Sequence, residues 1–274
     1  MTDDRNPSTR GWEEASGPDR VAPDAVAALA VLSHSTARET VRSAVEADPA
    51  CADFAEQFVV DVSSVTDGQR AALAAALGPA TFGFVQALYV SDFTGRVAHA
   101  WRQLFGIEPA PFDPQTVELW PAINEFLTSV ARLRGLDPLT SELVRLRGAR
   151  PHDCRLCKTL RSVPAIEMGG TEERFDAVDR YETSDLPDRQ KVALRLTDAI
   201  LWQPEDYPEG LEEAVRQQFT PAEAVEIVLD VMRNAANKIA VALGADAPHV
   251  EDGVEYYDID DRGELVYGLT PGRS

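Results

Sequence analysis

The chain has 274 residues, of which 26 are Lys or Arg and 46 are Asp or Glu, so its formal net charge is −20. This acidic balance, with a pI near 4.5, argues against a role in binding nucleic acid or anionic membranes, because both need a basic surface. Apolar residues make up 44% of the chain, which is typical of a globular protein, and three cysteines are too few for a disulfide framework.

The N-terminus is polar and acidic, without the basic and apolar regions of a secretory signal. No stretch approaches the roughly 18 unbroken apolar residues that a membrane helix needs. We therefore expect a cytoplasmic protein that does not span a membrane.

In chain order, residues 1–22 are rich in Asp, Glu, Gly, Pro and Ser, which predicts a disordered tail. From Pro23 onward, apolar residues recur every three to four positions, so we expect an all-α fold. The predicted helices cover residues 23–33, 36–47, 50–62, 68–77, 79–105, 114–134, 138–149, 154–166, 171–181, 187–203, 209–218 and 221–243.

A faint internal repeat relates two parts of this helical region. Residues 68–79 align with residues 210–221 at a constant offset of 142. Both segments begin with glycine and end with proline. The repeat implies two related helical halves packed about a pseudo-twofold axis. The Pro-rich segment 108–114 separates them. We therefore expect an N-terminal half over residues 23–108 and a second helical domain over residues 112–250.

The last predicted helix, 221–243, is apolar on most faces, which is typical of a helix at the centre of a core. We expect its Asn234 and Asn237 to satisfy neighbouring polar groups, with a role in lining a pocket as the alternative. Residues 251–274 form an acidic tail. Within it, 254–259 and 264–268 flank a glycine-containing turn, which predicts a β-hairpin.

Cys154 and Cys157 form a C-x-x-C motif, a spacing that serves either redox exchange or metal binding. A zinc site would need two further ligands, for which His152 and His249 are candidates. Two inert, buried cysteines are a third alternative. We favour the redox alternative and expect no metal.

The surroundings of the motif favour a reactive thiol. Residues 142–161 contain six basic and two acidic side chains, which gives a local charge of +4. We expect Asp153 to cap the helix that carries both cysteines. In that helix Lys158 would share a face with Cys154, and Arg161 with Cys157. Nearby cations stabilise a thiolate.

Glu142, twelve residues before the first cysteine of the motif, completes a pattern that resembles the carboxymuconolactone decarboxylase and alkylhydroperoxidase D-like superfamily. The resemblance covers about residues 112–250. It implies a helical bundle without a bound cofactor. It also implies that Cys157 attacks the peroxide, that Cys154 resolves the product as a disulfide and faces outward to a dithiol reductant, and that Glu142 handles protons.

The chain departs from this family at Arg161, where the family has a histidine. Arginine can hold a thiolate electrostatically, but it cannot pass protons because its pKa stays above about 12. We therefore expect Arg161 to stabilise the thiolate, dithiol chemistry to be retained and peroxidase turnover to be impaired. A salt bridge between Glu142 and Arg161 that fixes the helices is an alternative role for both residues.

The sequence thus predicts a thiol-dependent oxidoreductase with peroxidase-type or disulfide-exchange chemistry, acting on a hydroperoxide or disulfide substrate. The alternative outside the class of enzymes is a non-catalytic scaffold or partner-binding protein on the same fold. A carboxymuconolactone-type decarboxylase is a further one. The resemblance also implies assembly through helices, although an internal duplication can supply within one molecule what other members obtain by pairing, so a homo-oligomer stays open.

Overall fold

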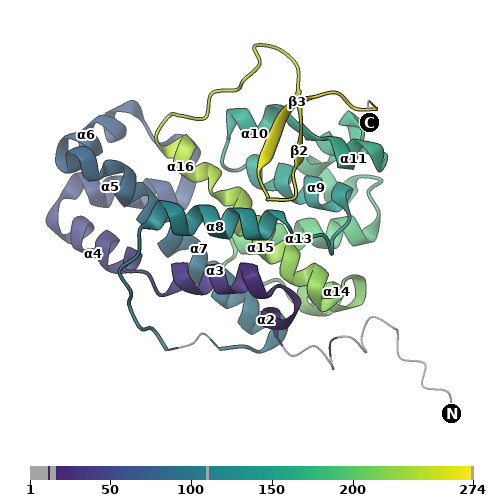
Figure 1. Ribbon diagram of the computed structural model, residues 1–274, viewed down its shortest axis with the longest axis horizontal. Helices are drawn as coiled ribbons and strands as arrows, with labels where there is room; N and C mark the ends of the chain where they lie inside the picture. Colours follow the sequence, from purple (N-terminus) through teal and green to yellow (C-terminus); the bar gives the residue numbers. More distant parts are fainter. Residues whose placement is uncertain (1–11, 13–16, 109–110, 273–274) are drawn as a thin grey trace.

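The computed structural model describes residues 12, 17–108 and 111–272. It confirms the predicted all-α fold with a short C-terminal hairpin (Figure 1). The α-helices are α2 (Pro18–Val21), α3 (Pro23–Ser33), α4 (Ala37–Ala47), α5 (Pro49–Asp61), α6 (Asp67–Leu77), α7 (Thr81–Phe105), α8 (Leu119–Ala131), α9 (Pro138–Ala149), α10 (Arg155–Thr159), α11 (Val163–Glu167), α12 (Glu172–Asp176), α13 (Asp188–Trp202), α14 (Leu211–Gln218), α15 (Pro221–Ala235) and α16 (Asn237–Ala242). The strands are β1 (Leu160–Ser162), β2 (Glu255–Ile259) and β3 (Leu265–Leu269).

Helix α15 lies at the centre of the molecule and packs against α7, α8, α9 and α13 (Figure 1). It begins with a capping box, in which Thr220 and Glu223 bond to each other's backbone N–H groups, and Pro221 occupies the first turn. One hydrophobic core extends from Ala22 to Ala242. The segments expected to form two halves, on either side of the Pro-rich segment 108–114, therefore both contribute to this core.

Part of the segment expected to be a disordered tail is ordered. Pro18–Val21 form a helical turn and Pro18 is buried. The indole of Trp12 donates a hydrogen bond to the Phe219 carbonyl at 2.9 Å and stacks on the Phe105 ring. Residues 1–11 and 13–16 of that predicted tail lie outside the described residues.

One helical stretch, Asp67–Phe105, is long and apolar enough to cross a membrane, with a mean hydropathy of 1.5 in its most apolar window. It consists of α6, a 3-10 turn and α7. A single stretch of this kind is weak evidence for a membrane span, because the core helix of a soluble protein passes the same test. Within this stretch, Phe84, Tyr89 and Phe93 of α7 belong to the hydrophobic core.

The prediction of one helix over residues 154–166 was wrong, because β1 lies between α10 and α11. The side chain of Ser162 accepts a hydrogen bond from the backbone of Ala165, and Pro164 stands in the first turn of α11. A capping serine followed by proline starts a new helix rather than continuing an old one. The freed strand pairs in parallel with β2, Leu160 opposite Glu255.

The C-terminal hairpin pairs β2 with β3 in antiparallel register. Its turn is closed by the Asp260 carboxylate, which accepts from the backbone N–H groups of Arg262 and Glu264, each at 2.9 Å. Gly263 in this turn has a φ of +84°, and a Cβ added to it would collide with the carbonyl of Thr128 in α8. The turn is therefore pressed against α8 and holds the hairpin beside α9–α11 (Figure 1).

We expect Gly263→Ala to destabilise the protein more than Gly268→Ala. Both glycines have positive φ, which costs about 1–3 kcal/mol for other residues. Only Gly263 also lacks space for a Cβ, which adds about 1–3 kcal/mol of overpacking. Urea unfolding of the two variants measures the difference. Equal losses of stability would show that the turn does not dock on α8.

Candidate functional site

Cys154 and Cys157 are joined as a disulfide, with Cα atoms 5.3 Å apart. Cys154 is the N-cap of α10, and its Sγ accepts the backbone N–H of Cys157 at 3.2 Å. Asp153 does not cap this helix as predicted, since it adopts a φ of +49° and its carboxylate pairs with Lys158. The cap belongs to the cysteine itself because the chain turns sharply at Asp153.

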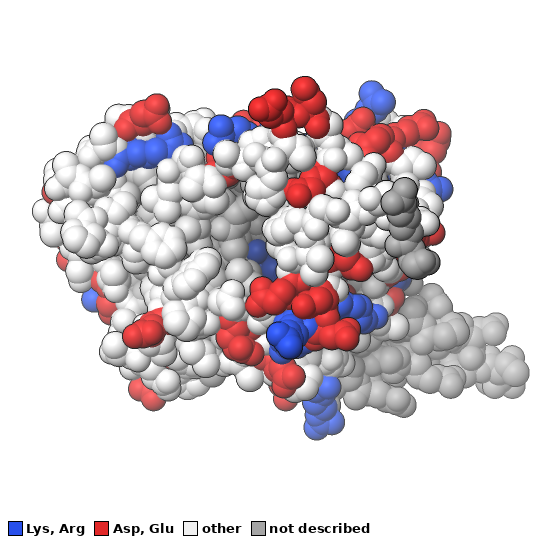
Figure 2. Space-filling model, turned by 45° about the horizontal axis from the view of Figure 1, so that its top comes forward, with Lys and Arg blue, Asp and Glu red and all other residues white. Residues whose placement is uncertain are grey.

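The two sulfurs differ in their access to solvent. Cys154 is 1% exposed, whereas Cys157 is half-buried and opens into a pocket of about 1,140 Å³, including its mouth. The expectation that Cys154 faces outward was therefore wrong. We call this space the dithiol pocket; its polar lining includes Asn124, Arg145, Arg233, Asn234, Asn237 and Tyr257. In Figure 2 the side of the molecule that carries the hairpin faces the reader, and basic atoms lie inside a hollow in its surface.

Two successive hydrogen bonds connect Cys157 to a buried histidine. The Asn237 amide nitrogen lies 3.5 Å from the sulfur of Cys157, and the Asn237 oxygen lies 2.8 Å from Nδ1 of His152. Burial, reinforced by the charge of Lys238, lowers the pKa of His152 to about 3, so the imidazole is neutral at physiological pH. We assign its single N–H to Nδ1, because the Asn237 oxygen can only accept. His152 thereby turns the amide N–H of Asn237 toward the sulfur.

Glu142 is 2% exposed and its carboxylate is saturated with hydrogen bonds. It accepts two from Arg145, at 2.7 and 2.8 Å, one from the hydroxyl of Tyr257 at 2.9 Å, and one from the backbone of Ser162 at 3.1 Å. Burial raises the pKa of Tyr257, so its hydroxyl keeps its proton and donates. Glu142 thus joins α9, β1 and the hairpin.

Arg145 extends this cluster to the redox motif. Its guanidinium also donates to the carbonyls of Cys157 and Leu160, both at 2.8 Å. These two carbonyls bracket the end of α10, so the arginine fixes the segment that carries the accessible sulfur. In the sequence, Arg145 is one of six basic residues between positions 142 and 161, and its spacing does not distinguish it from the others.

The structure does not bring Arg161 to the disulfide or to Glu142. Its guanidinium pairs with Glu172 at 2.8 Å, donates to the Lys158 carbonyl at 2.7 Å and lies over the ring of Phe175. The expected roles as thiolate stabiliser and as partner of Glu142 both assumed an unbroken helix, and that helix ends at Thr159. Among the cations lining the dithiol pocket is Arg233, on α15.

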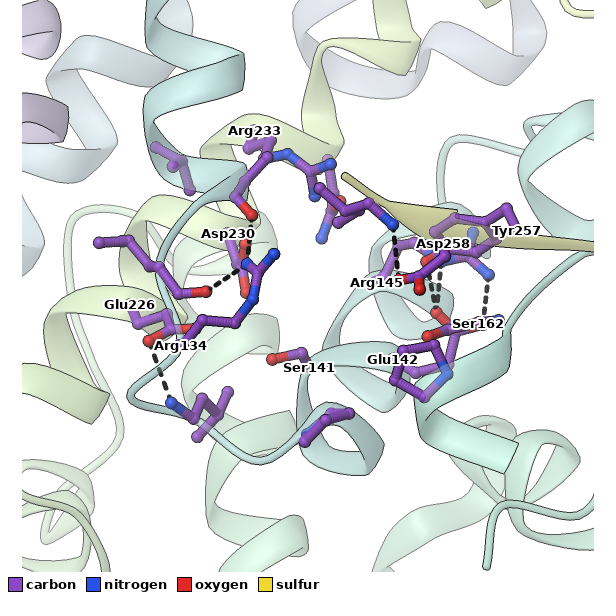
Figure 3. A pocket seen from close by; sticks show the side chains of 18 residues that line it. Arg134, Ser141, Glu142, Arg145, Ser162, Glu226, Asp230, Arg233, Tyr257 and Asp258 are labelled. Carbon is purple, nitrogen blue, oxygen red and sulfur yellow. Dashed lines mark hydrogen bonds and ion pairs between the residues drawn. The ribbon is translucent and has the colours of Figure 1, made fainter. Parts of the chain in front are cut away.

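A second cavity, of about 650 Å³ including its open mouth, adjoins the dithiol pocket and shares Arg145, Arg233, Asn234 and Tyr257 with it. We call it the acid cavity, because Glu226 and Asp230, one turn apart on α15, line it (Figure 3). Burial, with the charge of Asp230 nearby, raises the pKa of Glu226 to about 7, and burial raises the pKa of Asp230 to about 6. This pair is not among the site residues predicted from the sequence. The feature of the sequence that could have indicated it is the i, i+4 spacing of two carboxylates on an otherwise apolar core helix.

We expect Asp230→Asn to become progressively more stable than the wild type as pH rises. A carboxyl whose pKa is raised in the folded state holds a proton that the unfolded chain has lost, so wild-type stability falls between about pH 4 and 6. The rise from 3.8 to about 6 corresponds to about 3 kcal/mol. Urea unfolding of both proteins across this range measures the effect. A constant difference between them would contradict the raised pKa.

Comparison with known proteins finds no matching protein-family model and no matching solved structure. The chain is 46% identical over 232 residues to the uncharacterized protein Rv2313c of Mycobacterium tuberculosis (strain H37Rv) and to MT2376 of strain CDC 1551, and the match covers 81% of each chain. It is 29% identical over 108 residues to the uncharacterized protein YdfG of Bacillus subtilis, covering 38% of this chain and 74% of YdfG. Because the mycobacterial identity extends over four-fifths of both chains, the protein belongs to the same family as Rv2313c of M. tuberculosis.

Proposed function

We propose that this protein is a cytoplasmic thiol oxidoreductase whose Cys154–Cys157 pair cycles between disulfide and dithiol. The observation that carries the proposal is a disulfide with one buried sulfur and one sulfur that opens into a pocket. Thiol–disulfide exchange needs access to one sulfur and a good leaving group at the other. The resemblance to the alkylhydroperoxidase D-like superfamily supports the same chemistry.

In the reductive step, a thiolate of a dithiol reductant attacks Sγ of Cys157, the accessible atom. The S–S bond breaks and Cys154 leaves as a thiolate, stabilised by the backbone N–H of Cys157, and then takes up a proton. The second thiol of the reductant attacks the mixed disulfide and releases Cys157. The reductant ends as a disulfide, and the cysteine pair gains two electrons and two protons.

The reduced pair would pass these electrons to a substrate disulfide by the reverse route. The Cys157 thiolate attacks the substrate, and the Asn237 amide donates a hydrogen bond to the sulfur that carries the charge. Cys154 then attacks Cys157 and releases the reduced substrate. His152 is a positioning residue in this scheme, since it acts on the sulfur only through Asn237.

A hydroperoxide is a less favoured substrate. The Cys157 thiolate would attack one oxygen, the O–O bond would break, and the leaving alkoxide would need a proton to become an alcohol. Cys157 would then be a sulfenic acid, which Cys154 converts to the disulfide with loss of water. Among the described residues, the side chain hydrogen-bonded to the sulfur of Cys157 is the amide of Asn237, which is not an acid. We therefore expect disulfide exchange to outpace peroxide turnover.

The accessibility of the two sulfurs predicts unequal reactivity of the single-cysteine variants. We expect Cys154→Ser, which retains Cys157, to react with dipyridyl disulfide at least about tenfold faster than Cys157→Ser, which retains the buried Cys154. Release of thiopyridone followed by absorbance, with mass spectrometry of the trapped mixed disulfide, measures both rates. Equal rates, or two unreactive thiols, would favour the scaffold alternative. If the protein is a decarboxylase instead, Cys157→Ser should keep its activity.

Asn237→Ala tests the hydrogen bond to the accessible sulfur. In the Cys154→Ser background, we expect this change to slow alkylation of Cys157 by iodoacetamide about threefold to tenfold at neutral pH, because the thiolate loses a donor. The pH midpoint of the rate should move upward. Asn234→Ala is the matched control: Asn234 lines the same pocket, but no hydrogen bond from it to either sulfur occurs among the described residues. If both variants slow alkylation equally, Asn237 has no specific role.

A further inference from the structure

Asp230 is a buried carboxylate on which Arg134 and Arg233 act only by longer-range charge. It is only 7% exposed, and within the described part of the chain its side chain takes part in no hydrogen bond or ion pair. Its oxygens face the acid cavity (Figure 3). A buried carboxylate without a donor costs free energy, so the natural complement to Asp230 is a hydrogen-bond donor brought in by a ligand.

Arg233 is the second group in the cavity whose side chain has no ion pair or hydrogen bond with any described residue. It is half-buried and lies three residues after Asp230 on α15, so both side chains project to the same side of the helix. By contrast, Arg145 is bound to Glu142, and Glu226 accepts backbone N–H groups from Gly135 and Leu136 at 2.6 and 3.0 Å. An unpaired guanidinium is suited to a carboxylate, which it can bind through two parallel hydrogen bonds.

The remaining lining defines the body of the ligand. Val130, Leu133, Leu136, Pro164 and Ile259 contribute apolar surface to the cavity, whose volume without its open mouth is about 110 Å³, room for several waters or one small organic molecule. Three arginines, at positions 134, 145 and 233, and four carboxylates, of Glu142, Glu226, Asp230 and Asp258, line the same space. Arg134 and Arg233 act by charge on Asp230 itself, so an ammonium group bound to Asp230 would also lie near two cations. A hydroxyl is therefore a better donor for Asp230 than an amine.

We propose that the acid cavity binds a small hydroxy acid, with its carboxylate on Arg233, its hydroxyl on Asp230 and its apolar body against the aliphatic wall. The cavity shares Arg233, Asn234 and Tyr257 with the dithiol pocket, so the ligand lies beside the redox site. The proposal does not rest on the proposed redox function, because it needs no reaction at the disulfide.

Mandelate and phenylacetate, which differ only in one hydroxyl, are the test ligands. Their binding to the full chain is measured by ligand-observed NMR titration above about pH 7, where Asp230 is ionised. We expect mandelate to bind at least about tenfold more tightly, because a hydrogen bond to a charged group is worth about 1.5–3 kcal/mol. Asp230→Leu, of similar size, should abolish this preference while keeping phenylacetate bound. Arg233→Met should weaken both acids. Benzyl alcohol, which lacks the carboxylate, should bind more weakly than mandelate.

Equal affinities for the two acids, no binding of either, or a preference that survives Asp230→Leu would overturn the proposal. Should that variant fail to fold, Asp230→Asn keeps the size and removes the charge, and it must reduce the preference at least about threefold. Reduction of the disulfide with dithiothreitol should leave mandelate affinity unchanged. Failure of the redox proposal would therefore not affect this result, and failure of binding would not affect the thiol kinetics.

Discussion

The buried guanidinium of Arg145 is the interaction on which the site depends. It binds Glu142 on its own helix and holds the carbonyls of Cys157 and Leu160, while Glu142 accepts from Tyr257 of the hairpin. Three separate segments of chain thus meet on one ion pair. A buried pair of this kind adds little net stability, but loss of one partner costs about 3–5 kcal/mol because the other charge is left without compensation. Its contribution here is to fix where the accessible sulfur lies.

This cluster also separates two spaces of different chemistry. Cys157 opens into one, whereas Glu226 and Asp230 line the other, and Arg145 and Tyr257 contribute to both walls. The acid cavity depends on α15, a helix that is central to the core yet carries two carboxylates on one face. Burying them raises both pKa values and costs stability at neutral pH. Glu226 has backbone donors from Gly135 and Leu136, so Asp230 is the carboxylate that the proposed ligand would complement.

The residues that contact the two cysteines differ from those that the family resemblance implied. The histidine expected four residues after Cys157 is an arginine, and that arginine is engaged with Glu172. The hydrogen bond to the accessible sulfur comes instead from Asn237, with His152 behind it. Neither residue can transfer a proton readily, since one is an amide and the other is neutral with a pKa of about 3. The proposed preference for disulfide exchange over peroxide cleavage rests on this arrangement.

The sequence by itself determined the features that depend on neighbours within about four residues. The helix starting at Pro221, the hairpin turn at Gly263 and the C-x-x-C spacing are all local signals, and each is present in the fold. Only the tertiary structure decided which sulfur is exposed and which side chains surround it. The partners involved are distant in the chain: Asn237 is 80 residues from Cys157, and Tyr257 is 115 from Glu142. No local preference encodes such contacts, because they form when separate helices pack on one core.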